Sequence, residues 1–198
     1  MLDDLYADHI PKEVIRKLPL LYFDESITVV DSNAELEEKI QALWKEEILG
    51  FDTESKPTFR KGQYHPTCLV QLATEKEAFL IRIDKVTDHR PLTDLLEYKG
   101  VAKLGISITD DLIDLKKVCP FSPSSFYDLN DLAREAGLKH IGVRKLTALL
   151  LKKRISKNQQ TSNWENEDLT DAQKRYAATD AWICLQLYKK MNEFGYFI

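Results

Sequence analysis

The chain has 198 residues, of which 43% are hydrophobic and 30% are charged, and its formal net charge at pH 7 is −4. This length is enough for one α/β domain with its own apolar core, and the composition is typical of a soluble globular protein. No apolar run approaches the roughly 18 residues of a membrane-spanning helix, and residues 1–5 lack the apolar core of a secretion signal. We therefore expect a cytoplasmic protein without a membrane partner.

The cysteines indicate neither a disulfide framework nor a zinc site. Cys68, Cys119 and Cys184 lie far apart, are odd in number and lack zinc-ligand spacing, which favours packing roles in a reducing compartment. The acidic net charge does not suggest nucleic acid as a partner. It argues against that partner only weakly, because a nuclease must gather carboxylates at its centre.

Hydrophobic patterning predicts an α/β fold with a mixed central sheet flanked by helices. The predicted strands are residues 27–30, 48–54, 68–73, 78–83 and 101–104. The predicted helices are residues 33–47, 91–97, 110–118 and 170–191, and the pattern is helical throughout beyond residue 128. Short connections predict that the second, third and fourth strands form an antiparallel meander. We predict one domain at 26–198 and an N-terminal extension at 1–25.

The first predicted helix has a clear start and one apolar face. Ser32 and Glu35 have the spacing of a capping box, in which each side chain binds the backbone of the other residue. The apolar face consists of Leu36, Ile40, Leu43 and Trp44. This periodicity predicts that the helix packs against the sheet through that face.

The run Gly50-Phe51-Asp52-Thr53-Glu54 places two carboxylates at the end of the second predicted strand. Residues two apart in a strand point to the same face, so Asp52 and Glu54 can converge on one cation. Hard oxygen ligands of this kind favour Mg²⁺ or Mn²⁺. The same run would suit a strand that simply ends at the surface, but the apolar residues ahead of the carboxylates indicate a buried strand.

A second polar pair lies on the last predicted helix, which a capping box at Thr170 and Gln173 opens. Tyr176 and Asp180 are four residues apart and therefore lie on one face of this helix. The same face carries Ala172, Ile183 and Leu187. We expect this face to point inward, where an unpaired aspartate is costly. Either a metal ion or a hydrogen bond between the tyrosine and the aspartate would satisfy the carboxylate.

Together these fragments resemble the signature of the DEDDy 3′–5′ exonucleases, the family of ribonuclease D and of the exonuclease domain of the Werner syndrome helicase. The matching residues are Asp52, Glu54, Asp111, Tyr176 and Asp180. Asp111 is chosen on this resemblance alone, because Asp110 and Asp114 share its helix start, where acids also suit the helix dipole. The resemblance covers roughly residues 25–192. Arg175 occupies the place of the histidine in the sister DEDDh group, which favours the tyrosine type.

The resemblance implies a ribonuclease H-like fold and hydrolysis of the 3′-terminal phosphodiester bond with two metal ions, releasing 5′-mononucleotides. It implies that Asp52, Glu54, Asp111 and Asp180 hold two Mg²⁺ or Mn²⁺ ions, while Tyr176 orients the attacking water. Clustered carboxylates repel one another without these ions. We therefore expect raised carboxyl pKa values or local loosening in the metal-free protein.

Two basic stretches are candidates for nucleic-acid binding, because cations contact phosphates and aromatic rings stack on bases. One stretch lacks acidic residues between Glu135 and Glu165, and its candidates are Arg144, Lys145, Lys152, Lys153, Arg154 and Lys157. The other is the loop after the acidic strand, with Lys56, Arg60, Lys61 and Tyr64. The alternatives are a solvated helix face and a loop whose aromatic residues fold back on the domain.

The leading expectation is a metal-dependent 3′–5′ exonuclease acting on nucleic acid with a free 3′ end. DNA is favoured as substrate, in DNA repair with a possible separate helicase or polymerase partner. RNA trimming of the ribonuclease D type is the alternative. A noncatalytic nucleic-acid-binding module is less favoured, because such a module should have lost at least one of the five signature residues and none is lost.

Overall fold

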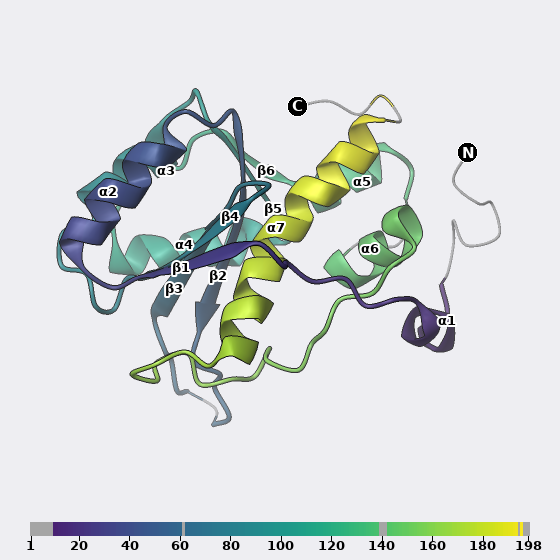
Figure 1. The fold of residues 1–198 in the computed structure, drawn as a ribbon, viewed down its shortest axis with the longest axis horizontal. Coiled ribbons are helices and arrows are strands. Elements are labelled where there is room, and N and C mark those ends of the chain that lie inside the picture. Colours follow the sequence, from purple (N-terminus) through teal and green to yellow (C-terminus); the bar gives the residue numbers. More distant parts are fainter. Residues whose placement is uncertain (1–9, 61, 139–141, 194, 196–198) are drawn as a thin grey trace.

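A computed structural model describes residues 10–60, 62–138, 142–193 and 195, which form a six-stranded mixed sheet flanked by helices (Figure 1). The strands are β1 (Ser26–Val30), β2 (Ile48–Ser55), β3 (Thr67–Ala73), β4 (Glu77–Arg82), β5 (Ala102–Gly105) and β6 (Phe126–Asp128). The helices are α1 (Lys12–Lys17), α2 (Asn33–Leu43), α3 (Arg90–Glu97), α4 (Ile108–Val118), α5 (Leu129–Glu135), α6 (Val143–Leu151) and α7 (Asp171–Asn192). The predicted α/β class is confirmed.

The sheet has the strand order β1-β4-β3-β2-β5-β6. β2, β3 and β4 pair antiparallel, which confirms the predicted meander, whereas β1, β5 and β6 each pair in parallel with a neighbour. The sequence pattern did not reveal β6 or α1. β6 has three residues and α1 has six, which is too short for hydrophobic periodicity to stand out.

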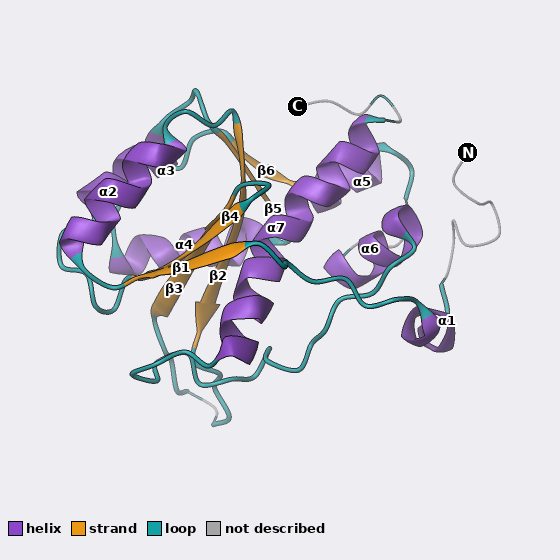
Figure 2. Ribbon diagram, in the orientation of Figure 1, coloured by secondary structure: helices purple, strands orange, loops and turns teal. Residues whose placement is uncertain are grey.

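Helices cover both faces of the sheet. α2, α3 and α4 lie on one face, and α7 crosses the other with α5 and α6 beside it (Figures 1 and 2). A large apolar cluster joins α2, α3 and α4 to the sheet, and it includes Leu36, Leu92, Leu115, Phe51 and Val70. Two further clusters join α7 to the sheet and to α5 and α6. The central strands are therefore buried on both sides, which fixes their register firmly.

Two predicted helix boundaries and one predicted packing contact were wrong. α2 ends at Leu43 rather than at residue 47, and Trp44 is 38% exposed instead of packing with the apolar face. Glu46 and Glu47 follow, and negative charges oppose the dipole at a helix C-terminus. α4 begins at Ile108 with Ser107 as its N-cap, earlier than residue 110.

The segment 152–170 contains no helix, although the pattern beyond residue 128 predicted one throughout. It includes the polar run 156–163, which offers no apolar stripe for a helix to bury. The predicted capping box at Thr170 and Gln173 is present and starts α7 after this loop. None of the helices in the described part of the chain is long and apolar enough to span a membrane.

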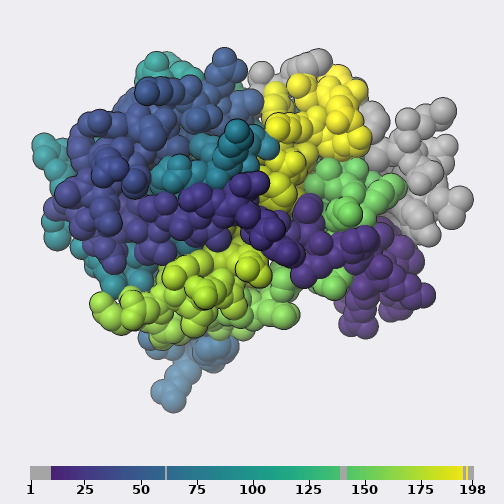
Figure 3. Space-filling model, in the orientation of Figure 1, coloured from purple at the N-terminus to yellow at the C-terminus, as the bar shows by residue number. Residues whose placement is uncertain are grey.

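The chain before β1 lies against α6, the 152–170 loop and α7. α1 packs on α6 through Ile15 and Leu149. Leu20 then forms a parallel bridge with Arg154, and the Phe23 amide donates a hydrogen bond of 3.0 Å to Thr179 Oγ1 on α7. Figure 3 shows this stretch as a continuous purple band that borders the loop along one side.

Candidate active site

One face of β2 supplies the first two carboxylates of the site. A Cβ atom on Gly50 would lie 2.1 Å from the Ala181 carbonyl oxygen, so this position faces α7 and lets the helix approach closely only because it is glycine. Side chains alternate along a strand, so Asp52 and Glu54 point to the same side as Gly50. The close helix therefore covers both carboxylates.

Helix α7 brings the third carboxylate to the same place. Carboxylate oxygens of Asp52, Glu54 and Asp180 all lie within 4.8 Å of one another. Tyr176 lies one turn before Asp180, and its ring packs against Trp164 with centroids 6.0 Å apart. Trp164 is fully buried in the loop ahead of α7. The structure thus brings four of the five signature residues close together, and the Trp164 ring restrains the Tyr176 ring by packing against it.

Burial raises the pKa of all three clustered acids, and the charges of neighbouring acids add to the shift for Asp52 and Glu54. Burial, followed by the charges of Asp180 and Asp111, raises the pKa of Asp52 well above its ordinary value. Burial and the charge of Asp52 raise the pKa of Glu54 in the same direction. Burial raises the pKa of Asp180, although its interaction with the Tyr176 hydroxyl opposes the shift. Without a cation, the cluster is an electrostatic strain on the fold.

The fifth signature residue, Asp111, stands slightly apart from the other three acids. It accepts a hydrogen bond of 2.6 Å from Thr53 Oγ1, whose side chain leaves β2 on the face opposite Asp52. Burial raises the pKa of Asp111, and this hydrogen bond opposes the shift. Thr53 was not identified from the sequence, although its place between the two strand carboxylates was the available signal.

The start of α4, which carries Asp111, is held by contacts from α5 and β6. Ser107 has a left-handed φ of 63°, and the Asn130 amide donates a hydrogen bond of 2.8 Å to its hydroxyl. Asp128 accepts a hydrogen bond of 3.2 Å from the Ile108 amide. A non-glycine residue with positive φ persists where its surroundings hold it in place. These contacts fix the position from which Asp111 projects.

The donor set fits divalent cations. All the clustered ligands are carboxylate oxygens, the type that Mg²⁺ and Mn²⁺ prefer, and their mutual repulsion is relieved by positive charge. A fully buried amide lies beside them, since Gln71 on β3 is paired directly with Asp52. Neither its nitrogen nor its oxygen has a hydrogen-bond partner among the described residues. Unsatisfied buried polar atoms are rare in native folds, and a role beside a bound ion or water accounts for such a group next to Asp52.

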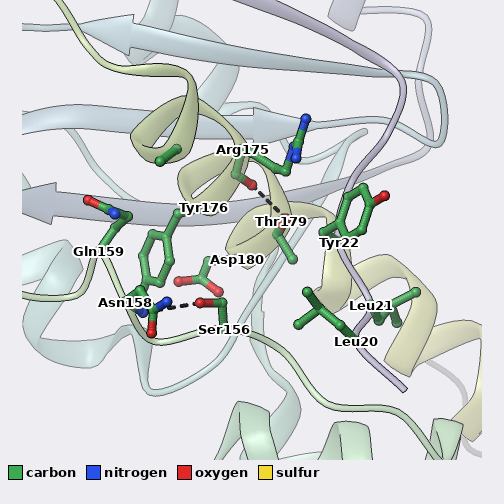
Figure 4. A pocket seen from close by; sticks show the side chains of 11 residues that line it. Leu20, Leu21, Tyr22, Ser156, Asn158, Gln159, Arg175, Tyr176, Thr179 and Asp180 are labelled. Atoms are coloured by element: carbon green, nitrogen blue, oxygen red, sulfur yellow. Dashed lines mark hydrogen bonds between the residues drawn. The ribbon is translucent and has the colours of Figure 1, made fainter. Parts of the chain in front are cut away.

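A cavity of about 230 Å³ opens beside Tyr176 and Asp180 (Figure 4). Three separate segments line it: the chain before β1, the loop ahead of α7, and α7 itself. Its lining includes Leu20, Leu21, Tyr22, Ser156, Asn158, Gln159, Arg175 and Thr179. Burial raises the pKa of the Tyr176 phenol further above neutral pH, and its hydroxyl interacts with the Asp180 carboxylate at the edge of this cavity.

The candidate nucleic-acid residues after β2 are partly engaged within the protein. Lys56 Nζ lies 3.0 Å from Glu165, and the Tyr64 ring lies 5.0 Å below the ammonium group of Lys117. Arg60 is exposed, and Lys61 lies outside the described residues. The two exposed or half-exposed side chains, Arg60 and Tyr64, keep a surface that a substrate can reach.

The other basic stretch divides into two groups. Arg154 is bound into the fold, since its Nε donates a hydrogen bond of 3.0 Å to the Leu18 carbonyl, whereas Lys152 is exposed and Lys153 is half-buried. Arg144, Lys145 and Lys157 line a second cavity of about 480 Å³, and Lys12 of α1 joins them there. No acidic residue is among the described residues that line this cavity. The charge of Lys157 also lowers the pKa of Asp180 in part.

Comparison with known proteins agrees with this geometry. Residues 27–194 match the 3′–5′ exonuclease family. The chain is 32% identical to the mouse (Mus musculus) bifunctional 3′–5′ exonuclease/ATP-dependent helicase WRN, covering 90% of this chain and 13% of that protein. It is 32% identical to ribonuclease D of Haemophilus influenzae, covering 81% of this chain and 40% of the relative. The chain thus spans less than half of either protein.

Solved structures support the fold. The Aedes aegypti Nibbler EXO domain superposes with a TM-score of 0.79 at 26% identity, covering 87% of this chain and 90% of that one. Escherichia coli RNase D superposes with a TM-score of 0.76 at 22% identity, covering 88% of this chain and 47% of that one. The ribonuclease H-like architecture implied by the sequence resemblance is therefore confirmed. The chain belongs to the DEDDy-type 3′–5′ exonuclease family.

Proposed function

We propose that this chain is a metal-dependent 3′–5′ exonuclease that releases 5′-mononucleotides from the 3′ end of nucleic acid. The observation that carries the proposal is the convergence of Asp52, Glu54 and Asp180 within 4.8 Å, beside a tyrosine that opens into a cavity. Hydrolysis of a phosphodiester needs an activated water and stabilisation of a leaving oxygen. Two divalent ions held by carboxylates supply both when bound.

The chain's own residues have distinct roles in this proposal. Asp52, Glu54, Asp111 and Asp180 would hold the Mg²⁺ or Mn²⁺ ions, the first two and Asp180 as the converging group and Asp111 from α4. A tyrosine hydroxyl is protonated at neutral pH, and burial raises the pKa of Tyr176 further, so this side chain can position a water by donating a hydrogen bond. Thr53 restrains Asp111, and Trp164 restrains the tyrosine ring. Both supports reduce the motion that misaligns a reacting group.

We propose DNA as the preferred substrate, because the mouse relative combines its exonuclease with a helicase in one protein. A separate helicase or polymerase partner, with a role in DNA repair, fits the same proposal. RNA is the second candidate, since the Haemophilus relative is a ribonuclease by name. The cavity with Lys12, Arg144, Lys145 and Lys157 would hold the phosphate backbone of either strand, with an affinity that falls with salt.

The test is digestion of matched oligonucleotides labelled at the 5′ end, as 3′-recessed DNA and as single-stranded RNA. Reactions contain Mg²⁺, Mn²⁺ or EDTA. A metal-dependent ladder that shortens from the 3′ end, and is absent in Asp52→Asn, supports the proposal and identifies the preferred sugar. Absence of cleavage with every metal, together with salt-sensitive binding, would instead support the noncatalytic module.

A further inference from the structure

One wall of the cavity beside Tyr176 comes from residues that precede the segment matching the exonuclease family, which begins at residue 27. Leu20, Leu21 and Tyr22 form this wall (Figure 4). The wall is fixed on both sides, because the Leu21 amide donates to the Arg154 carbonyl at 2.8 Å and the Phe23 amide donates to Thr179 Oγ1 at 3.0 Å. These hydrogen bonds hold the segment in a defined position beside the active site.

Tyr22 contacts a cation from α7 in the lining of the cavity. The Arg175 guanidinium carbon lies 5.0 Å from the centre of the Tyr22 ring, which is a cation–π contact. Tyr22 is 39% exposed, and Arg175 is exposed. Among the described residues, no carboxylate forms an ion pair with Arg175. The pair thus presents a planar, cationic surface one residue from the catalytic tyrosine.

The lining of this cavity suits a base better than a phosphate. Its lining contains one cation, which the Asp180 carboxylate offsets, together with two aromatic rings and two leucines. The amide side chains of Asn158 and Gln159 lie on the opposite side, and amides match the donors and acceptors on base edges. The 480 Å³ cavity, by contrast, gathers four cations and no described acid, as a phosphate site requires. The two cavities therefore differ in the part of a nucleotide that each accommodates.

We infer that Tyr22 and Arg175 form a nucleobase subsite, in which a base near the scissile bond packs against the pair while Asn158 and Gln159 contact its edges. This inference rests on the proposed exonuclease function and adds the residues that bind the substrate base. The N-terminal segment then contributes directly to substrate binding. Arg175, at the position of the histidine in the sister exonuclease group, serves recognition here.

The experiment is a cycle between protein variants and abasic substrates. Oligonucleotides carry an abasic residue at the first, second or third position from the 3′ end. We compare kcat/KM for wild type, Tyr22→Ala, Tyr22→Phe and Arg175→Ala. Tyr98→Ala is the matched control, because Tyr98 is another exposed tyrosine in a ring contact, with Trp44, outside both cavities.

We expect wild type to lose roughly 5- to 150-fold in kcat/KM at one abasic position, which corresponds to the stacking of one base. Tyr22→Ala and Arg175→Ala should lower the rate on intact substrate and abolish most of this discrimination, whereas Tyr22→Phe and Tyr98→Ala should retain it. If both alanine variants lost as much kcat/KM as wild type on every abasic substrate, the subsite would be overturned.

A binding version of the cycle separates this inference from the proposed function. Each variant is combined with Asp52→Asn, and oligonucleotide affinity is measured by fluorescence anisotropy in EDTA. Absence of digestion by wild type would overturn the exonuclease, but the binding cycle would still test the base subsite. Digestion by wild type, with equal affinity of all variants for intact and abasic strands, would overturn the subsite and leave the exonuclease intact.

Discussion

The two faces of β2 have opposite physical characters. On one face Phe51 is fully buried and packs edge-on against Phe126, with ring centroids 5.0 Å apart. On the other face Asp52 and Glu54 lie under α7, where burial raises both carboxyl pKa values. One face stabilises the fold through apolar contact, and the other places like charges together at a cost in stability.

This contrast teaches where the protein can tolerate strain. The apolar face connects the strand to the large cluster formed with α2, α3 and α4, which keeps β2 in register. The close approach of α7 at Gly50 then holds the acidic residues together. A functional cluster of like charges persists only when its surroundings overcome the repulsion. Changes on the two faces should therefore have opposite consequences for activity and stability.

The largest expected effect is on the acidic face. Asp52→Asn removes a charged ligand from the centre of the cluster, and we expect activity to fall by about 10³-fold or more, since metal stabilisation contributes several kcal/mol. The same change should raise the melting temperature of the metal-free protein, because a buried like charge is lost. Initial rates and thermal denaturation in EDTA check both parts.

Asp94→Asn is the control for this variant, because Asp94 is exposed on α3, away from the cluster. It should leave activity and melting temperature nearly unchanged. A destabilised but active Asp52→Asn protein would contradict the assignment of Asp52 to the metal site.

The apolar face should give the reverse result. Phe51→Ala opens a cavity against Phe126, and we expect a loss of about 3–5 kcal/mol in the free energy of unfolding. Phe51→Leu should lose much less, because it conserves most of the buried volume. Urea denaturation measures both values. Equal losses in the two variants would show that cavity formation does not explain the contribution of Phe51.

A pH series distinguishes the electrostatic strain from packing. Raised carboxyl pKa values mean that the folded, metal-free protein binds protons more tightly than the unfolded chain. Stability contributed by these protons is present below the unfolded pKa of about 4 and is lost as pH rises through the raised folded values. In EDTA the melting temperature should therefore fall as pH rises above about 5, through the raised pKa of Asp180 at about 7 and on toward that of Glu54 at about 10.

Saturating Mg²⁺ should reduce or reverse this slope, since the cation favours ionised carboxylates. Asp52→Asn should flatten the slope in EDTA because one titrating group is gone. Identical pH profiles of wild type and Asp52→Asn in EDTA would show that the cluster does not strain the fold.

The sequence predicted those features that rest on periodicity or capping. The meander, the capping box of α7 and the shared face of Asp52 and Glu54 follow from local pattern. Local pattern did not predict the hydrogen bond from Thr53 to Asp111 or the contact of Tyr22 with Arg175, because these contacts join residues 58 or more positions apart. Only tertiary packing decides such partners. β6 was missed because three residues carry too little pattern.

The smallest expected effect concerns Gln71, which belongs to the acidic face although it carries no charge. Its side chain lies opposite Asp52, fully buried and without a hydrogen-bond partner among the described residues. Gln71→Leu removes the unsatisfied buried amide, so we expect the metal-free protein to gain about 1–2 kcal/mol in the free energy of unfolding. The same exchange at the exposed Gln41 should leave stability unchanged within about 0.5 kcal/mol.

Activity of Gln71→Leu shows whether the amide serves the carboxylates. Polar groups beside metal ligands typically contribute about 10- to 100-fold to metal affinity or activity, because they orient the ligands. We therefore expect Gln71→Leu to be more stable and about 10-fold less active, with weaker Mn²⁺ binding by calorimetry. A gain in stability with unchanged Mn²⁺ affinity would mean that the amide strains the acidic face without orienting Asp52, and a loss of stability would mean that water satisfies it.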